Sequence, residues 1–117
     1  MKLRIKGDSV RLRLARSEVR RLVEAGRVEE TTHFAAGGTL GYVLQAGDVC
    51  AVEFNGARIV VTLPETEARE WAAGEQVGIY RTPESGVQLA VEKDFACLDR
   101  DDPDDADAFP NPKRGAC

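Results

Sequence analysis

The chain has 117 residues, of which 43% are hydrophobic, and its 16 basic and 20 acidic side chains give a net charge of -4. This length is enough for one globular domain, or for two intertwined small units that share a core, and the acidic excess argues against a general nucleic-acid binder. The longest apolar runs, such as Ile59–Val61, are far shorter than the roughly 20 residues that cross a bilayer, and no apolar leader follows Met1. We therefore expect a cytoplasmic protein without a membrane partner.

Residues 1–46 predict two pairs of strands around one short helix. Apolar residues alternate with polar ones before and after Gly7-Asp8, as in a half-buried β-hairpin. Gly26 and the Gly37-Gly38 pair are typical of a helix end and of a turn. The expected elements are a hairpin over residues 3–14, a helix over residues 16–25, and strands over residues 28–34 and 40–45.

Residues 47–95 predict the same order of elements. Asn55-Gly56 between alternating apolar residues favours a hairpin with a type I′ turn, in which both central residues adopt positive φ. Pro64 suits the entry of a helix, where its missing N–H is not needed, and Gly74 ends that helix. The expected elements are a hairpin over residues 52–63, a helix over residues 65–73, and strands over residues 77–80 and 87–93.

An ungapped shift of 49 residues relates the two halves and mostly pairs apolar residues with apolar residues. Identical pairs include Gly7 with Gly56, Leu14 with Leu63, and Val28 with Val77. We therefore predict an α+β fold, mostly β with two short helices, in which two ββαββ repeats form one intertwined domain. The repeats span residues 1–46 and 47–95, and an acidic tail containing cysteine and proline follows over residues 96–117.

Two segments resemble the AbrB/MazE family, also described as SpoVT-AbrB-type. Residues 3–14 are similar to the strand, Gly-Asn-Ser turn and strand that begin MazE-type antitoxins, although Asp8 and Ala15 stand where that pattern has Asn and Pro. Residues 55–65 resemble the AbrB pattern of a glycine, an apolar strand and a proline before the helix. Members dimerise by interleaving hairpins, and MraZ-type members carry two copies per chain. The resemblance implies a pseudo-twofold swapped-hairpin barrel, a pseudo-dimer within one chain that can be monomeric.

Basic side chains occupy the outward positions of the first hairpin and the start of the first helix. They are Lys2, Arg4, Lys6, Arg11, Arg13 and Arg16. Like charges that face each other across strands are destabilising, so this group is the best candidate for binding an anion. The family resemblance implies that these residues contact DNA phosphates, and arginine can also read guanine edges. The alternative is a solvated surface or one that faces a protein partner.

The second half lacks this charge at the positions related by the repeat. Those positions hold Ala51, Glu53, Asn55, Val60 and Thr62. Because phosphate neutralisation supplies most non-specific affinity for DNA, a symmetric grip on an operator is not expected.

The tail resembles another group of sequences and carries most of its charge as aspartate. Residues 91–99 and the Phe109-Pro110-Asn111-Pro112 segment look like an uncharacterised bacterial family. The acidic residues are Asp99, Asp101, Asp102, Asp104, Asp105 and Asp107. They are interpreted either as a disordered, solubilising end or as a segment that folds back on the basic hairpin. Calcium binding is a further alternative, although the glycine and the terminal glutamate of an EF-hand loop are missing.

Three cysteines and one histidine leave the redox and metal chemistry open. Cys50 shares strand parity with apolar neighbours and is expected to pack inward. Cys97 and Cys117 are interpreted as free thiols, as a disulfide that closes a loop of about 20 residues, or, with His33 and Asp99, as ligands of a divalent metal. His33 is otherwise a surface or structural residue.

The sequence offers no constellation of nucleophile and base, no phosphate loop and no cofactor motif. The leading hypothesis is therefore a non-enzymatic intracellular binding module for a protein or for an anionic partner. The first alternative is an AbrB/MazE-like DNA-binding regulator or antitoxin. The second is a metal-binding protein that uses the tail.

Overall fold

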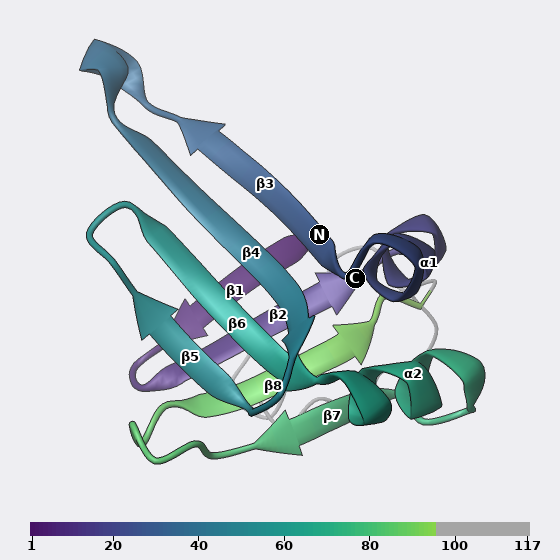
Figure 1. Cartoon of the computed structure of the whole chain (residues 1–117). Coiled ribbons are helices and arrows are strands. Elements are labelled where there is room, and N and C mark those ends of the chain that lie inside the picture. The colour runs from purple at the N-terminus through teal and green to yellow at the C-terminus, as the bar shows by residue number, and fades with distance from the viewer. Residues whose placement is uncertain (96–117) are drawn as a thin grey trace, which may run out of the picture.

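The computed structural model describes residues 1–95, which form two four-stranded sheets and two α-helices (Figure 1). The predicted α+β class, mostly β, is confirmed. The elements, in chain order, are β1 (Lys2–Lys6), β2 (Ser9–Leu14), α1 (Arg16–Ala25), β3 (Arg27–His33), the 3-10 turn η1 (Ala35–Gly37), β4 (Thr39–Gly47), β5 (Ala51–Phe54), β6 (Arg58–Pro64), α2 (Glu65–Ala73), β7 (Gly78–Arg81) and β8 (Gln88–Lys93).

Both helices begin and end at the predicted residues, for local reasons. At the start of α1 the Glu18 carboxylate accepts a hydrogen bond from the backbone N–H of Ala15 at 2.8 Å. Backbone N–H groups at the start of a helix have no acceptor within the helix, and this side chain supplies one. Gly26 ends α1 at φ 78°, a left-handed conformation that favours glycine, and donates its N–H to the carbonyl of Leu22 at 2.9 Å. Gly74 ends α2 in an extended conformation instead, at φ -96°.

Each sheet combines a hairpin from residues 1–47 with a hairpin from residues 51–93. Sheet A has the strand order β1-β2-β8-β7, and sheet B has the order β3-β4-β6-β5. The hairpins meet through parallel pairs, with Leu12 opposite Val91 in sheet A and Leu44 opposite Val61 in sheet B. Residues that are distant in the sequence therefore share one sheet face.

The hydrophobic core lies between the two sheets and extends beneath the helices, which cover one end of the molecule (Figure 1). Its innermost side chains are less than 2% exposed and include Leu12, Leu44, Val61, Val91 and Trp71. Burial of each such side chain is worth about 1.5–3 kcal/mol. The indole N–H of Trp71 also donates to the carbonyl of Val77 at 3.2 Å, so the only tryptophan ties α2 to the start of β7.

Two details of the predicted fold are wrong. Within residues 1–95 no strand pairing joins sheet A to sheet B, so the sheets stack rather than close into the predicted barrel. The β5–β6 loop is not a type I′ turn, because Gly56 has φ 88° whereas Asn55 does not adopt positive φ. Three residues, Asn55 to Ala57, separate the strands, and this longer loop needs only one left-handed residue.

In the described part of the chain, no helix combines the length and the apolar character required to cross a membrane.

Candidate functional site

Five basic side chains gather on the outer face of sheet A, and we refer to them as the basic strip. They are Lys2, Arg4, Lys6, Arg11 and Arg13. Strand alternation places them there, because the intervening residues of β2, such as Leu12, are buried in the core. The β1–β2 register sets Lys2 opposite Arg13 and Arg4 opposite Arg11. The side chains of Lys2, Arg11 and Arg13 are 74%, 26% and 25% exposed.

Strand β8 supplies a carboxylate to the centre of this surface. Glu92 lies opposite Arg13 in the parallel pair, and its carboxylate forms ion pairs with the Nε atoms of Arg11 at 3.3 Å and Arg13 at 3.5 Å. The hydroxyl of Tyr80, on β7, donates to the same carboxylate at 2.7 Å. Partial burial, and then this hydrogen bond, raise the pKa of Tyr80 to about 12. Glu92 thus joins β2, β8 and β7 through side chains.

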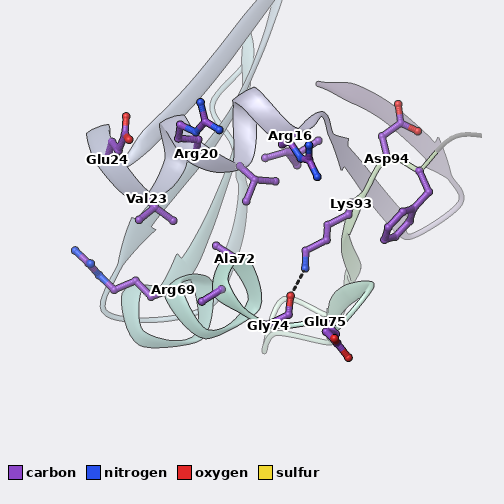
Figure 2. A pocket seen from close by; sticks show the side chains of 14 residues that line it. Arg16, Arg20, Val23, Glu24, Arg69, Ala72, Gly74, Glu75, Lys93 and Asp94 are labelled. Atoms are coloured by element: carbon purple, nitrogen blue, oxygen red, sulfur yellow. Dashed lines mark hydrogen bonds between the residues drawn. The ribbon is translucent and has the colours of Figure 1, made fainter.

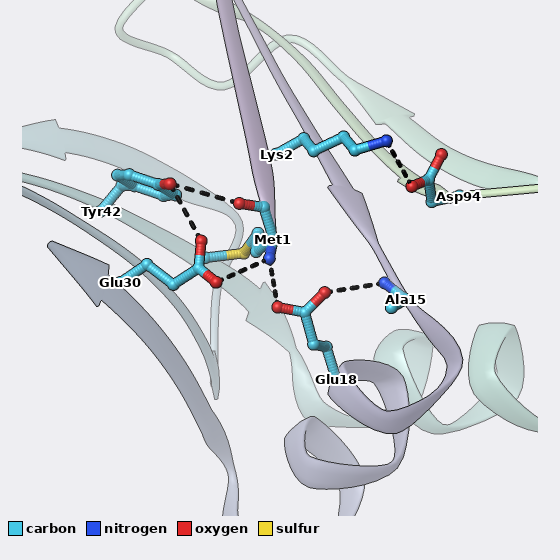
Figure 3. Close-up of polar contacts among 7 residues, drawn as sticks. All are labelled: Met1, Lys2, Ala15, Glu18, Glu30, Tyr42 and Asp94. Carbon is cyan, nitrogen blue, oxygen red and sulfur yellow. Dashed lines mark hydrogen bonds and ion pairs between the residues drawn. The ribbon is translucent and has the colours of Figure 1, made fainter. Parts of the chain in front are cut away.

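A second carboxylate, that of Asp94, contacts the end of the basic strip at Lys2 (Figure 3). Its side chain pairs with the Lys2 amine at 2.9 Å, and its backbone N–H donates to the carbonyl of Leu14 at 2.8 Å. This backbone bond holds the chain beside β2 where β8 ends. Glu92 and Asp94 therefore both contact the basic strip, one at its centre and one at its end.

Polar contacts around Met1 fix the position of β1 (Figure 3). The Met1 amine forms ion pairs with Glu18 of α1 and with Glu30 of β3, the latter at 3.0 Å. Tyr42 of β4 donates to Glu30 at 2.9 Å. Burial alone lowers the pKa of the amine, but the two carboxylates outweigh it and the pKa is raised. Burial raises the pKa of Glu30, but the contacts with the Met1 amine and Tyr42 outweigh burial, and the pKa is lowered.

The structure separates Arg16 from the other five predicted residues. Arg16 is the first residue of α1 and lines a groove between α1 and α2, so it does not lie on the outer face of sheet A (Figure 2). This groove has a volume of about 870 Å³, and sequence reasoning missed it because its walls come from both helices and from residues 93–95.

The outer face of sheet B differs from that of sheet A. The positions of β5 and β6 that lie 49 residues after members of the basic strip place Glu53 opposite Val60 and Ala51 opposite Thr62. Thr62 is buried and accepts from the side-chain amide of Gln45 at 3.1 Å. Sheet A thus sets Arg4 opposite Arg11, whereas sheet B sets the Glu53 carboxylate opposite the apolar Val60.

The remaining candidates from the sequence are scattered or lie elsewhere. His33 is exposed at the end of β3, and Cys97, Asp99 and Cys117 lie outside the described residues. Cys50 is half-buried against the core, as expected from its strand parity, and burial raises the pKa of its thiol. Over residues 1–95, no three His, Cys, Asp or Glu side chains come together in a group that could hold a metal.

The sequence of the chain places it in a family. A family model described as "Family of unknown function (DUF7009)" matches residues 1–113, and the chain belongs to this family. Neither the search of curated proteins nor the search of solved structures gave a significant match.

Proposed function

We propose that this member of a family of unknown function is a non-enzymatic binding module that engages an anionic partner through the basic strip. The observation that carries the proposal is the register of β1 and β2, which sets basic residues directly opposite one another. Such pairs destabilise a sheet unless other groups compensate them. Carboxylates of the chain already pair with this strip, as Glu92 and Asp94 do, and an anionic partner would add to or replace those contacts.

The proposed fold behind this module is an intramolecular swapped-hairpin pseudo-dimer of the AbrB/MazE type. Its support is the agreement of burial across the 49-residue shift. Leu12 and Val61 are both 0% exposed, and Leu22 and Trp71 are both 1% exposed. The exchange of hairpins between the two sheets supports it as well. A pseudo-dimer of this kind needs no second chain, so the module can act as a monomer.

The partner that fits best is an acidic protein surface. A DNA regulator with this architecture would use both repeats, and the positions of the second repeat that correspond to Arg4 and Arg11 hold Glu53 and Val60. The alternative of an AbrB/MazE-like regulator or antitoxin is supported by the resemblance of residues 3–14. The second alternative, a metal site in the tail, concerns Cys97, Asp99 and Cys117, which lie outside the described residues.

The two leading functions can be separated by measuring binding to poly-L-glutamate and to duplex DNA at increasing salt concentration. We expect binding to poly-L-glutamate that weakens with salt and falls about tenfold in the Arg4→Gln/Arg11→Gln variant. Arg58→Gln/Arg69→Gln is the matched control, because it removes equal charge from β6 and α2. Tighter binding to DNA with a steep salt slope would favour the regulator. Equal losses in the two variants would refute a role for the strip.

A further inference from the structure

The groove between α1 and α2 has the size and lining of a small-molecule site. Its volume of about 870 Å³ lies within the range of roughly 300–1,000 Å³ that is usual for ligand pockets. The apolar part of the lining comes from both helices and the end of β2. These residues are Leu14, Val19, Val23, Ala72 and Ala73, and Phe95 adds an aromatic ring from beyond β8. Leu14 and Val19 also belong to the hydrophobic core, which gives the groove a rigid floor.

Two cationic side chains lie together at one end of this groove. Figure 2 shows Arg16, from the start of α1, and Lys93, from the end of β8, on the same side of the apolar part. The Lys93 amine donates to the carbonyl of Gly74 at 2.8 Å and lies 5.8 Å from the centroid of the Trp71 ring. Its position is therefore fixed by groups without formal charge. No ion pair joins Arg16 to another described residue.

The carboxylates of the groove lining are directed elsewhere. Glu24 and Glu75 point outward, away from the space between the helices (Figure 2). Asp94 pairs with Lys2, and Arg69, the cation at the other end, pairs with Glu65 at 3.0 Å. The lining thus has Arg16 and Lys93 at one end, Arg20 and the ion-paired Arg69 elsewhere, and an apolar stretch.

We propose that this groove binds an organic anion with an apolar body, whose carboxylate lies between Arg16 and Lys93 and whose body packs against Val19, Val23 and Ala72. Charge complementarity selects the anionic head, and the apolar stretch selects the body. Glu24 and Glu75 at the margins would repel a second negative charge. They favour a ligand with a single anionic head over an acidic peptide.

Octanoate is a suitable probe, because it has one carboxylate and a short apolar chain. We expect it to bind the full chain, as measured by displacement of the fluorescent anion 8-anilinonaphthalene-1-sulfonate, whereas acetate and octanol compete poorly. Arg16→Gln should weaken the binding of octanoate about tenfold, which is the change expected for the loss of one charge-assisted contact. Val23→Asp should weaken it at least as much, because it places a negative charge in the apolar stretch.

The matched control is Arg21→Gln, which removes the same charge from α1 beside Glu30 and away from the groove lining. Thermal denaturation of each variant shows whether the fold is intact. Equal loss of octanoate binding in Arg16→Gln and Arg21→Gln would overturn the proposal. Binding that appears only after residues 96–117 are removed would also overturn it, in favour of the tail as the occupant. Arg16→Gln should leave poly-L-glutamate binding unchanged, so this test is independent of the basic strip.

Discussion

Replacing Glu92 with glutamine tests the electrostatics of the basic strip most directly. The Glu92 side chain is 14% exposed and contacts Arg11 and Arg13, whose side chains are about one quarter exposed. Exposed ion pairs are worth about 0.2–1 kcal/mol, and hydrogen bonds to charged groups about 1.5–3 kcal/mol. The contacts of 3.3 and 3.5 Å are long and partly screened, so we expect a loss of about 1–2 kcal/mol in the free energy of unfolding.

The same substitution should strengthen binding of an anionic partner. Removal of one negative charge about 4 Å from an incoming anion in a high-dielectric setting is worth about 1 kcal/mol, or about fivefold in affinity. Denaturant titration gives the stability change and the poly-L-glutamate assay gives the affinity change. Reduced stability with unchanged affinity would mean that Glu92 is structural and that the basic strip does not bind the partner.

The Tyr80 titration provides a third measurement on this variant. Burial is the larger cause of the raised pKa and the hydrogen bond to Glu92 is the smaller one, so in Glu92→Gln the pKa should fall below about 12 and stay above 10. Phenolate absorbance reports it, and the difference from Tyr80→Phe isolates the Tyr80 contribution from that of Tyr42. An unchanged Tyr80 titration would refute the hydrogen bond.

The remaining predictions concern stability. The Tyr80 pKa is higher in the folded chain than in the unfolded chain. The contribution of Tyr80 to the free energy of unfolding is therefore complete below pH 10 and is lost as the pH rises toward about 12. Unfolding of Tyr80→Phe should show a shallower decline over that interval, and an equal slope would contradict the assignment. Trp71→Ala should lose about 3–5 kcal/mol by denaturant titration, whereas exposed Phe34→Ala should change stability by less than about 0.5 kcal/mol. Gly26→Ala, at φ 78°, should cost about 1 kcal/mol, and Gly38→Ala, at φ -72°, should be nearly neutral in the same titration.

Sequence patterns predicted what depends on neighbouring residues and missed what depends on distant ones. The helices at residues 16–25 and 65–73 followed from apolar spacing and from glycine or proline at their ends, which act locally. The placement of Glu92 beside Arg13 required knowledge that β8 pairs with β2, and the alternating pattern of either strand does not indicate its partner. The groove was missed for the same reason, because Arg16 and Lys93 approach each other only after sheet A has formed.

The charge difference between the two sheets suggests a gain-of-function experiment. If the 49-residue shift reflects a real duplication, Glu53 and Val60 correspond to Arg4 and Arg11, and the two pairs occupy equivalent register positions. Glu53→Arg/Val60→Arg should therefore create a second basic pair on the outer face of sheet B. Glu53 is exposed and Val60 is half-buried, so thermal denaturation of the variant shows whether the fold tolerates both arginines.

We expect this variant to gain at least tenfold in affinity for duplex DNA, with a salt slope steeper by about two, because each added phosphate contact contributes about 0.9. The matched control is Thr66→Arg/Glu70→Arg, which adds the same charge on the exposed side of α2. If only Glu53→Arg/Val60→Arg gains affinity for DNA, the architecture suits DNA and the natural chain lacks half of the binding surface. An equal gain in both variants would reflect net charge alone and would remove the support that the duplication gives to the DNA alternative.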